Sequence, residues 1–365
     1  MINTSRFTRH VSRKSGMIHY WRDYQKEIAE DEFFYVRSCI RQNFFPGAEN
    51  LFIDILRNKL GKKVFEDADH TTCTGIGYHS DIVPIETTMT VIARQFALMK
   101  ERGYRNLVIS CVTSFGLYSE ILDLWKHDPA LKTKIEGYLS EATGRSFDEP
   151  ANMVHASDIL YKFRYEIAEQ AVNRLVNNET GLPLRVVDHI GCHYAKTFPE
   201  RGIGGSEFPQ VLTGLIKAWG GETVDYPERR HCCGFGFRQY ILQSSRGYSI
   251  SHSRTKLESM MPYEPDLIVA NCPGCAMFLD RWQYTLEETD GSVYGPGRTK
   301  IPVVTHEELA GLVLGYDPWE IGLQTHQVPV EGLLDKIGIR YDPEKKYADR
   351  QGKLIGDTVA VTAIV

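Results

Sequence analysis

The sequence predicts an α/β protein made of two similar halves, each built on a parallel β-sheet. Three observations predict this class. All eight cysteines fall into two copies of one spacing pattern, and each half alternates short apolar runs with amphipathic segments. In addition, Gly61 and Gly220 each lie fourteen residues before the glycine of a cysteine motif, Gly75 in one half and Gly234 in the other. Alternation of this kind is typical of α/β layers, and the internal similarity favours two repeated units.

The predicted strands are short apolar runs bounded by turn residues, as expected for parallel strands that are buried on both faces. They cover residues 33–36, 107–109, 185–187 and 267–269. The second of them runs into Cys111, and the fourth runs into Cys272. The sequence therefore places cysteines at the carboxyl ends of parallel strands, which is the edge where open α/β folds bind their ligands.

The predicted helices are amphipathic and cover residues 51–60, 85–100, 119–125 and 211–219. The first ends at Gly61 and the last at Gly220, as helices commonly do, because glycine adopts the left-handed conformation without steric cost. His155 and His306 start two further segments that resemble each other. We expect these two histidines to have structural roles near helix starts.

The 365 residues are expected to divide into an N-terminal extension (1–32), a first repeat (33–170), a second repeat (171–316) and a C-terminal tail (317–365). The formal net charge of -5 gives no reason to expect a nucleic-acid partner. No apolar run approaches the roughly 18 residues that cross a bilayer, and no signal-peptide pattern follows the start. We therefore expect a cytoplasmic protein with no transmembrane segment.

The cysteine pattern is complete in the second half. A single cysteine is followed after 39 residues by an adjacent pair, and after 38 more by a Cys-Pro-Gly-Cys motif. Thiolate sulfur selects zinc, copper(I) or iron-sulfur clusters, and five sulfurs from three places suit a metal site better than a disulfide framework. Zinc needs only four ligands, so we expect an iron-sulfur cluster, with zinc or inert thiols as alternatives. The five residues are Cys192, Cys232, Cys233, Cys272 and Cys275.

The first half keeps three cysteines, Cys39, Cys73 and Cys111, while Thr74 and Ser114 stand where the pattern has the other two. A serine hydroxyl is far less acidic than a thiol, so we expect Ser114 to be a weak iron ligand or none. These residues predict a second iron-sulfur cluster with three cysteine ligands and an open fourth position. A metal-free site and a zinc site remain alternatives.

The motif Cx39CCGx37CxxC with a preceding duplicate resembles the cysteine-rich CCG domain. A chain of two such domains without a ferredoxin module resembles the CCG-domain subunit of heterodisulfide reductase and its bacterial relatives, over about residues 33–316. The resemblance implies that the five cysteines of the second half bind a noncubane 4Fe-4S cluster in which one sulfur bridges two irons. It also implies two duplicated CCG domains related by a pseudo-twofold axis, with the substrate disulfide bound between their clusters.

The resemblance further implies an oxidoreductase subunit that couples electron transfer to disulfide or thiol chemistry. Its partners would be a ferredoxin-like iron-sulfur subunit and a flavoprotein subunit, since the chain lacks a ferredoxin cysteine run and a dinucleotide fingerprint. The degenerate first motif is similar to variants from sulfur oxidisers, in which the substrate is protein-bound lipoate or persulfide, so a lipoyl carrier protein is a candidate partner. The alternatives are a non-catalytic electron-transfer subunit of a CCG-containing dehydrogenase complex and a zinc-binding interaction module.

Several polar residues flank the cysteine motifs. His193 and His231 are candidate proton donors, because disulfide reduction consumes protons and histidine titrates near pH 7. The alternative is that they only donate hydrogen bonds to a cluster sulfide or a carbonyl. Tyr78, Lys196 and Arg238 are candidates for lining a substrate pocket, where the two basic side chains would suit a carboxylate or a phosphate; otherwise they serve as surface charge and packing.

Overall fold

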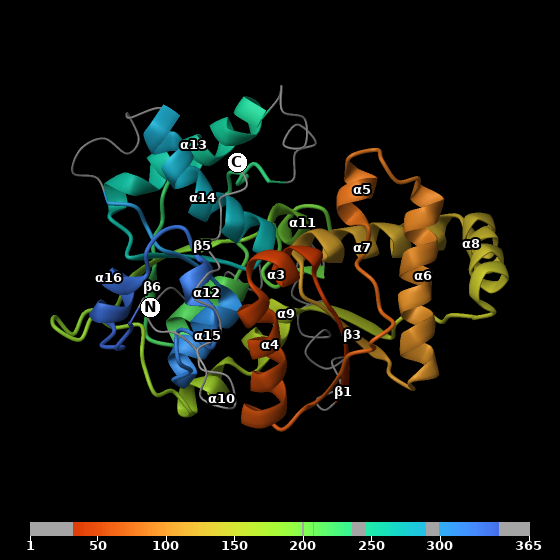
Figure 1. Cartoon of the computed structure of the whole chain (residues 1–365), viewed down its shortest axis with the longest axis horizontal. Coiled ribbons are helices and arrows are strands. Elements are labelled where there is room, and N and C mark those ends of the chain that lie inside the picture. The colour runs from red at the N-terminus through yellow and green to blue at the C-terminus, as the bar shows by residue number, and fades with distance from the viewer. Residues whose placement is uncertain (1–31, 199–200, 207, 236–245, 290–298, 343–365) are drawn as a thin grey trace, which may run out of the picture.

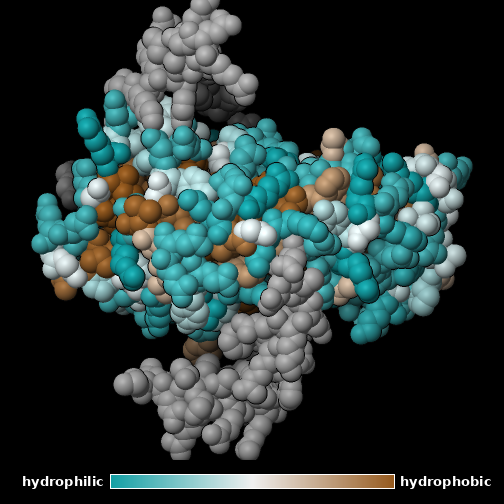
Figure 2. Space-filling view, turned by 90° about the horizontal axis from the view of Figure 1, so that it is seen from below, coloured by the Kyte–Doolittle hydropathy of each residue, from teal (hydrophilic) through white to brown (hydrophobic). Residues whose placement is uncertain are grey.

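The computed structural model describes residues 32–198, 201–206, 208–235, 246–289 and 299–342. The predicted N-terminal extension therefore lies outside the described residues apart from its last residue, and so does the tail beyond residue 342. Among the helices of the described ranges, none is both long and apolar enough to cross a membrane. The face seen in Figure 2 is mostly hydrophilic, with hydrophobic residues gathered in patches between polar ones.

The described residues form two parallel four-stranded sheets, which confirms the predicted α/β class. The first sheet has the order β2-β1-β3-β4 and the second the order β6-β5-β7-β8. In both sheets the first strand along the chain lies between the second and the third, and the fourth forms an edge. The strands are β1 (Glu32–Val36), β2 (Lys63–Phe65), β3 (Asn106–Ile109), β4 (Asn152–His155), β5 (Arg185–His189), β6 (Glu222–Thr223), β7 (Leu267–Ala270) and β8 (Val303–Thr305).

Helices connect the strands and cover the sheets (Figure 1). Those of the first half are α3 (Cys39–Phe44), α4 (Pro46–Asp54), the π-helix η1 (Ile55–Lys59), α5 (Gly75–His79), α6 (Ile85–Glu101), α7 (Val112–His127), α8 (Pro129–Thr143), α9 (Ala156–Lys162) and α10 (Arg164–Glu169). Those of the second half are α11 (Cys192–Ala195), α12 (Val211–Ala218), α13 (Arg246–Met260), the 3-10 helix η5 (Met261–Tyr263), α14 (Pro273–Thr289), α15 (His306–Leu314), the 3-10 helix η6 (Leu323–Thr325) and α16 (Glu331–Lys336).

Two predicted helix ends are confirmed. Gly61 has φ +64° and Gly220 has φ +98°, in the left-handed region that favours glycine. In each case the next residue donates a backbone hydrogen bond back into the helix, from Lys62 to Leu56 at 2.7 Å and from Gly221 to Ile216 at 2.9 Å. The same device therefore ends the helix that precedes β2 and the helix that precedes β6.

The two halves share one core and interlock. All residues of β3 and β7 are buried, as predicted for strands covered on both faces. Helices α9 and α10 of the first half pack against α12 and α15 of the second, and α4 also packs against α15. In Figure 1 the helices α3, α4, α7 and α11 accordingly lie between the flanking groups α5, α6, α8 and α13, α14, α16. The described part of the tail packs on this body, since Leu333 and Leu334 of α16 are buried.

Candidate metal centre

The carboxyl ends of the strands deliver the cysteines, as the sequence predicts. Cys39 opens α3 just after β1, and Cys192 opens α11 just after β5. Cys111 caps α7 after β3, and Cys272 precedes α14 after β7. The remaining motifs follow the shorter strands β2 and β6 in the same way. The cysteines of each half are thereby gathered at one edge of its sheet, where a parallel α/β sheet binds ligands.

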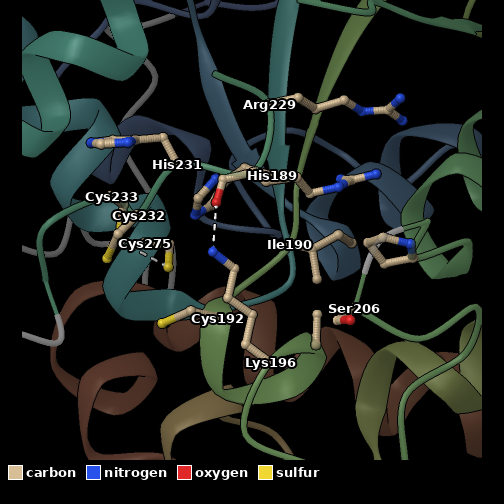
Figure 3. A pocket seen from close by; sticks show the side chains of 13 residues that line it. His189, Ile190, Cys192, Lys196, Ser206, Arg229, His231, Cys232, Cys233 and Cys275 are labelled. Carbon is tan, nitrogen blue, oxygen red and sulfur yellow. Dashed lines mark hydrogen bonds between the residues drawn. The ribbon is translucent and has the colours of Figure 1, made fainter. Parts of the chain in front are cut away.

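The five cysteines of the complete motif lie close together, and we call them the complete site. The thiol of Cys233 donates a hydrogen bond to the sulfur of Cys275 at 3.1 Å, and the thiols of Cys192 and Cys232 are also hydrogen-bonded to each other. Figure 3 shows these four side chains on one side of a pocket. None of the eight cysteines, all within the described residues, forms a disulfide. This set of free, clustered thiols fits a soft metal or an iron-sulfur cluster.

Contacts between the thiols shift their pKa values in opposite directions. Hydrogen bonds from Cys192 and then Cys233 lower the pKa of Cys232 to about 2. A hydrogen bond from Cys111 lowers the pKa of Cys272 well below its ordinary value. The same contacts, together with burial, raise the pKa values of Cys192, Cys233 and Cys111. Two sulfurs are thus favoured as thiolates, the form that binds a metal.

A glycine turn holds the adjacent cysteine pair against α13. Gly234 has φ +91°, and its N–H donates a hydrogen bond to the Cys232 sulfur at 3.4 Å. Ser249 of α13 donates its hydroxyl to the Gly234 carbonyl at 2.6 Å, and Ser253 donates to the Cys233 carbonyl at 2.5 Å. Backbone N–H groups that point at sulfur are typical of sites that bind iron-sulfur clusters.

Replacing Gly234 with alanine is expected to disrupt the complete site. The added Cβ would lie 2.2 Å from the Ser249 carbonyl oxygen, and φ +91° is a conformation that alanine rarely adopts. We expect a loss of about 2 kcal/mol or more in the free energy of unfolding, together with lower metal content after purification. The control is Gly137→Ala on α8, where nothing lies within 4 Å of the new Cβ. Equal stability and metal content in the two variants would contradict the role of the turn.

Three cysteines and a serine form what we call the first site. The sulfur of Cys73 lies 3.0 Å from the Ser114 hydroxyl and accepts a hydrogen bond from the Gly75 N–H at 3.3 Å. Burial, followed by the nearby Cys73, raises the pKa of the Cys39 thiol. The Thr74 hydroxyl instead donates to the Cys73 carbonyl at 2.7 Å. Ser114 therefore lies against a cysteine sulfur, whereas the hydroxyl of Thr74 serves the local backbone.

The two sites adjoin each other. The thiols of Cys111 and Cys272, from different halves of the chain, are hydrogen-bonded. The helices behind them meet at Gly191, where a Cβ would lie 2.7 Å from Val112 and 3.0 Å from the Cβ of Cys272. Asn271 fastens the same junction, because its side-chain oxygen accepts a hydrogen bond from the Gly191 N–H at 2.9 Å. Sequence spacing carries no signal for this contact between the halves.

His193 lies at the junction of the halves. Its ring stacks on that of His79 with centroids 5.3 Å apart and an interplanar angle of 10°. A Cβ on Gly116 of α7 would lie 2.8 Å from the Cβ of His193, so only glycine allows this approach. Burial, and then His193, lowers the pKa of His79 to about 4. The pair therefore joins α5 of the first half to α11 of the second.

His231 lies on the wall of a pocket beside the complete site (Figure 3). Its Nε2 lies 3.0 Å from Nδ1 of His252, and its Nδ1 lies 3.4 Å from a carboxylate oxygen of Glu228. Burial, followed by His252, lowers the pKa of His231. The pocket has a volume of about 20 Å³, room for about one water molecule. It is lined by His189, Ile190, Cys192, Ala195, Lys196, Ser206, Pro209, Arg229, Arg230, His231, Cys232, Cys233 and Cys275.

The other predicted pocket residues have separate places. The Lys196 ammonium lines the pocket and donates to the Arg230 carbonyl at 3.0 Å. Tyr78 donates its hydroxyl to Glu120 at 3.1 Å, in the first half. Arg238 lies outside the described residues. These three side chains are thus not brought together among the residues that the structure describes.

The comparisons with known proteins agree with this geometry. Residues 186–280 match the CCG family, described as a cysteine-rich domain. The chain is 28% identical over 327 residues to a subunit of ferredoxin:CoB-CoM heterodisulfide reductase from Methanosarcina acetivorans, covering 86% of this chain and 98% of the relative. It is 23% identical over 298 residues to the 8-methylmenaquinol:fumarate reductase membrane anchor subunit of Wolinella succinogenes, covering 80% and 98%.

A solved structure shares the fold. The crystal structure of a hypothetical protein from Helicobacter pylori superposes with a TM-score of 0.59 at 12% identity, covering 85% of this chain and 57% of that one. This chain thus spans little more than half of that protein, and the likeness concerns the fold alone. Residues 186–280 form a cysteine-rich CCG domain, in a chain that is related over most of its length to the corresponding subunit of Methanosarcina heterodisulfide reductases.

Proposed function

We propose that this chain is the iron-sulfur subunit of a heterodisulfide reductase-like complex and couples electron transfer to the redox chemistry of disulfides and thiols. The observation that carries the proposal is the meeting of the two cysteine sites at Cys111 and Cys272. Two redox centres in contact can deliver two electrons to one sulfur-sulfur bond. Reduction of a disulfide takes two electrons and two protons and yields two thiols.

In this proposal the complete site holds a noncubane 4Fe-4S cluster. The close thiols and the Gly234 N–H group support this assignment. The adjacent pair would let one sulfur bridge two irons while its neighbour binds terminally. The cluster would supply one-electron steps, and its ligands would be Cys192, Cys232, Cys233, Cys272 and Cys275.

The first site would hold a second iron-sulfur cluster on Cys39, Cys73 and Cys111. Ser114, whose hydroxyl lies 3.0 Å from the Cys73 sulfur, is the residue nearest to supplying an oxygen ligand. Three thiolates leave one ligand position open, as catalytic metal sites do. This asymmetry supports placing the sulfur chemistry where the two sites adjoin.

His193 is the proposed proton donor, because it lies at the junction of the halves next to Cys192 and in contact with His79. His231 is a second candidate, on the wall of the pocket at the complete site. We further propose that residues 33–170 and 171–316 are duplicated CCG domains related by a pseudo-twofold axis. The equal strand orders of the two sheets support this duplication.

The proposed partners are a ferredoxin-like iron-sulfur subunit and a flavoprotein subunit of the same complex. The relative from Methanosarcina acetivorans is named as a subunit of a ferredoxin-dependent enzyme, which supports the first of these. For the substrate we propose a disulfide or thiol, with protein-bound lipoate or persulfide sulfur as the leading candidates. A cytoplasmic location accords with these partners.

A non-catalytic electron-transfer subunit is the second candidate. The pocket at the complete site, at about 20 Å³, is too small for a disulfide substrate, and this favours a relay. EPR spectroscopy of the oxidised protein with and without dihydrolipoamide separates the two functions. A new signal that appears only with the thiol is the expected result, and an unchanged spectrum would favour the relay.

A further inference from the structure

A buried histidine without a hydrogen-bond partner lies against the complete site. His189, at the end of β5, is 2% exposed, and neither of its ring nitrogens has a hydrogen-bond partner among the residues that the structure describes. One ring nitrogen and the sulfurs of Cys233 and Cys275 all lie within 4.8 Å of one another. A buried polar group left unpaired costs about 1–3 kcal/mol. This orientation is therefore best explained by an interaction with what the cysteines hold.

The first sheet has an apolar residue in the same place. His189 pairs with Ala270, the second residue before Cys272. Val36 pairs with Ile109, the second residue before Cys111. The half with five cysteines thus has an imidazole at this register position, and the half with three has an isopropyl group.

A buried lysine repeats the contrast between the halves. Lys256 of α13 is fully buried, and its ammonium donates to the carbonyls of Glu228 and Arg229 at 3.2 and 2.9 Å, just before the adjacent cysteine pair. Burial lowers the pKa of Lys256 to about 8, with nearby Cys233 opposing this effect, so the group is largely charged at pH 7. In the first half the neutral side chain of Gln95 donates to the carbonyl of Thr71 at 2.7 Å, just before Cys73.

The chemistry of the complete site explains both differences. A cluster held by five thiolates is strongly anionic, and each added electron makes it more so. Hydrogen bonds to cluster sulfur and nearby positive charge stabilise the reduced form and raise the reduction potential. The valine and the glutamine at the matching places of the first half supply neither.

We propose that His189 and Lys256 are positioning residues that hold the complete site at a higher reduction potential than the first site, His189 by donating its N–H to a cluster sulfur and Lys256 by its charge. The proposal rests on the proposed iron-sulfur function. It makes the complete site the electron acceptor of the pair. Electrons would then pass one at a time from the first site to the complete site.

The test exchanges each residue for its counterpart in the other half. In a redox titration followed by EPR, His189→Val and Lys256→Gln should each retain iron and shift the midpoint potential of the complete site downward. His189→Gln, which keeps an N–H donor, should shift it less than His189→Val. The control is Lys217→Gln, which removes the charge of an exposed lysine on α12 and should leave the potential unchanged. Unchanged potentials in both His189→Val and Lys256→Gln would overturn the proposal.

A second measurement covers the outcome in which a variant loses its iron. The protein is labelled with 15N-histidine in a His193→Gln background, and the nitrogen coupling of the complete-site signal is measured. A weak coupling that is typical of a hydrogen bond supports the role of His189. No coupling, or the strong coupling of a direct iron-nitrogen bond, would overturn that role. Wild-type protein that contains zinc and no iron would instead refute the proposed function itself.

Discussion

Cys233→Ser is expected to lose the complete-site cluster or to convert it to another type. The Cys233 sulfur is 2% exposed and lies 3.1 Å from that of Cys275, in the middle of the thiol set. A serine at this place cannot supply a thiolate, and its hydroxyl is far less acidic. Iron content should fall by up to the whole share of the complete site, and its EPR signal should disappear or change form.

The matched control is Cys73→Ser in the first site, which should leave the signal of the complete site in place. Cys73 lies on the other sheet, with Ser114 as its side-chain neighbour. Both variants should be purified without oxygen, and the fold should be checked by circular dichroism. The ligand assignment would be wrong if Cys233→Ser kept the iron content and the spectrum of the wild-type protein.

Arg41→Met is expected to destabilise the protein by about 3–5 kcal/mol, because it leaves a buried charge unpaired. Arg41 of α3 and Glu307 of α15 are fully buried, with Nη1 and Oε2 2.5 Å apart. The Nη1 N–H is not aimed at that oxygen, so the attraction is mainly Coulombic. Arg41 also donates its Nε to the Ser110 carbonyl at 2.7 Å, next to Cys111. Chemical unfolding at pH 7 measures the loss.

The double variant Arg41→Met with Glu307→Leu separates the missing contact from the unpaired charge. Replacement of both partners by apolar side chains is often nearly neutral, so the double variant should recover much of the lost stability. If the double variant were as unstable as Arg41→Met alone, the loss would come from packing or from the contact to Ser110. The account of a buried ion pair that joins the halves would then be wrong.

The effect of Arg41 should depend on pH. Burial raises the pKa of Glu307, but Arg41 and then His306 lower it more, so that it lies below its ordinary value. A carboxylate with a lowered pKa stabilises the fold above its unfolded pKa, and this contribution disappears as the pH falls through the folded value. The difference between wild type and Arg41→Met should therefore be full at pH 7 and shrink below about pH 4.

Much of the fold could be predicted because hydrophobic pattern and glycine placement act locally. Gly61 and Gly220 end their helices as expected, and His155 caps α9 by accepting a hydrogen bond from the Ser157 N–H. The helix predicted for residues 119–125 in fact starts at Val112, because Val112, Thr113 and Gly116 are poor helix formers that hide its first turns. Strands β2 and β6 have three and two residues, too few to show an alternating pattern.

The candidate site was predictable in its cysteines and not in its surroundings. Spacing alone places the sulfurs at the ends of the strands, since each motif follows a strand directly. The contact between Cys111 and Cys272 depends on how the halves interlock, which no local pattern encodes. His189 and Lys256 likewise gain meaning only from burial and from the register that sets them against Val36 and Gln95. Long-range packing decides these features, so they require coordinates.

Metal and sulfide analysis of protein purified without oxygen, combined with Mössbauer spectroscopy, tests the central claim most directly. The account predicts iron and acid-labile sulfide in equal amounts, with a noncubane 4Fe-4S spectrum that disappears in Cys233→Ser. A second, different iron environment should remain in that variant, on Cys39, Cys73 and Cys111. Colourless protein with stoichiometric zinc and no labile sulfide would contradict the account.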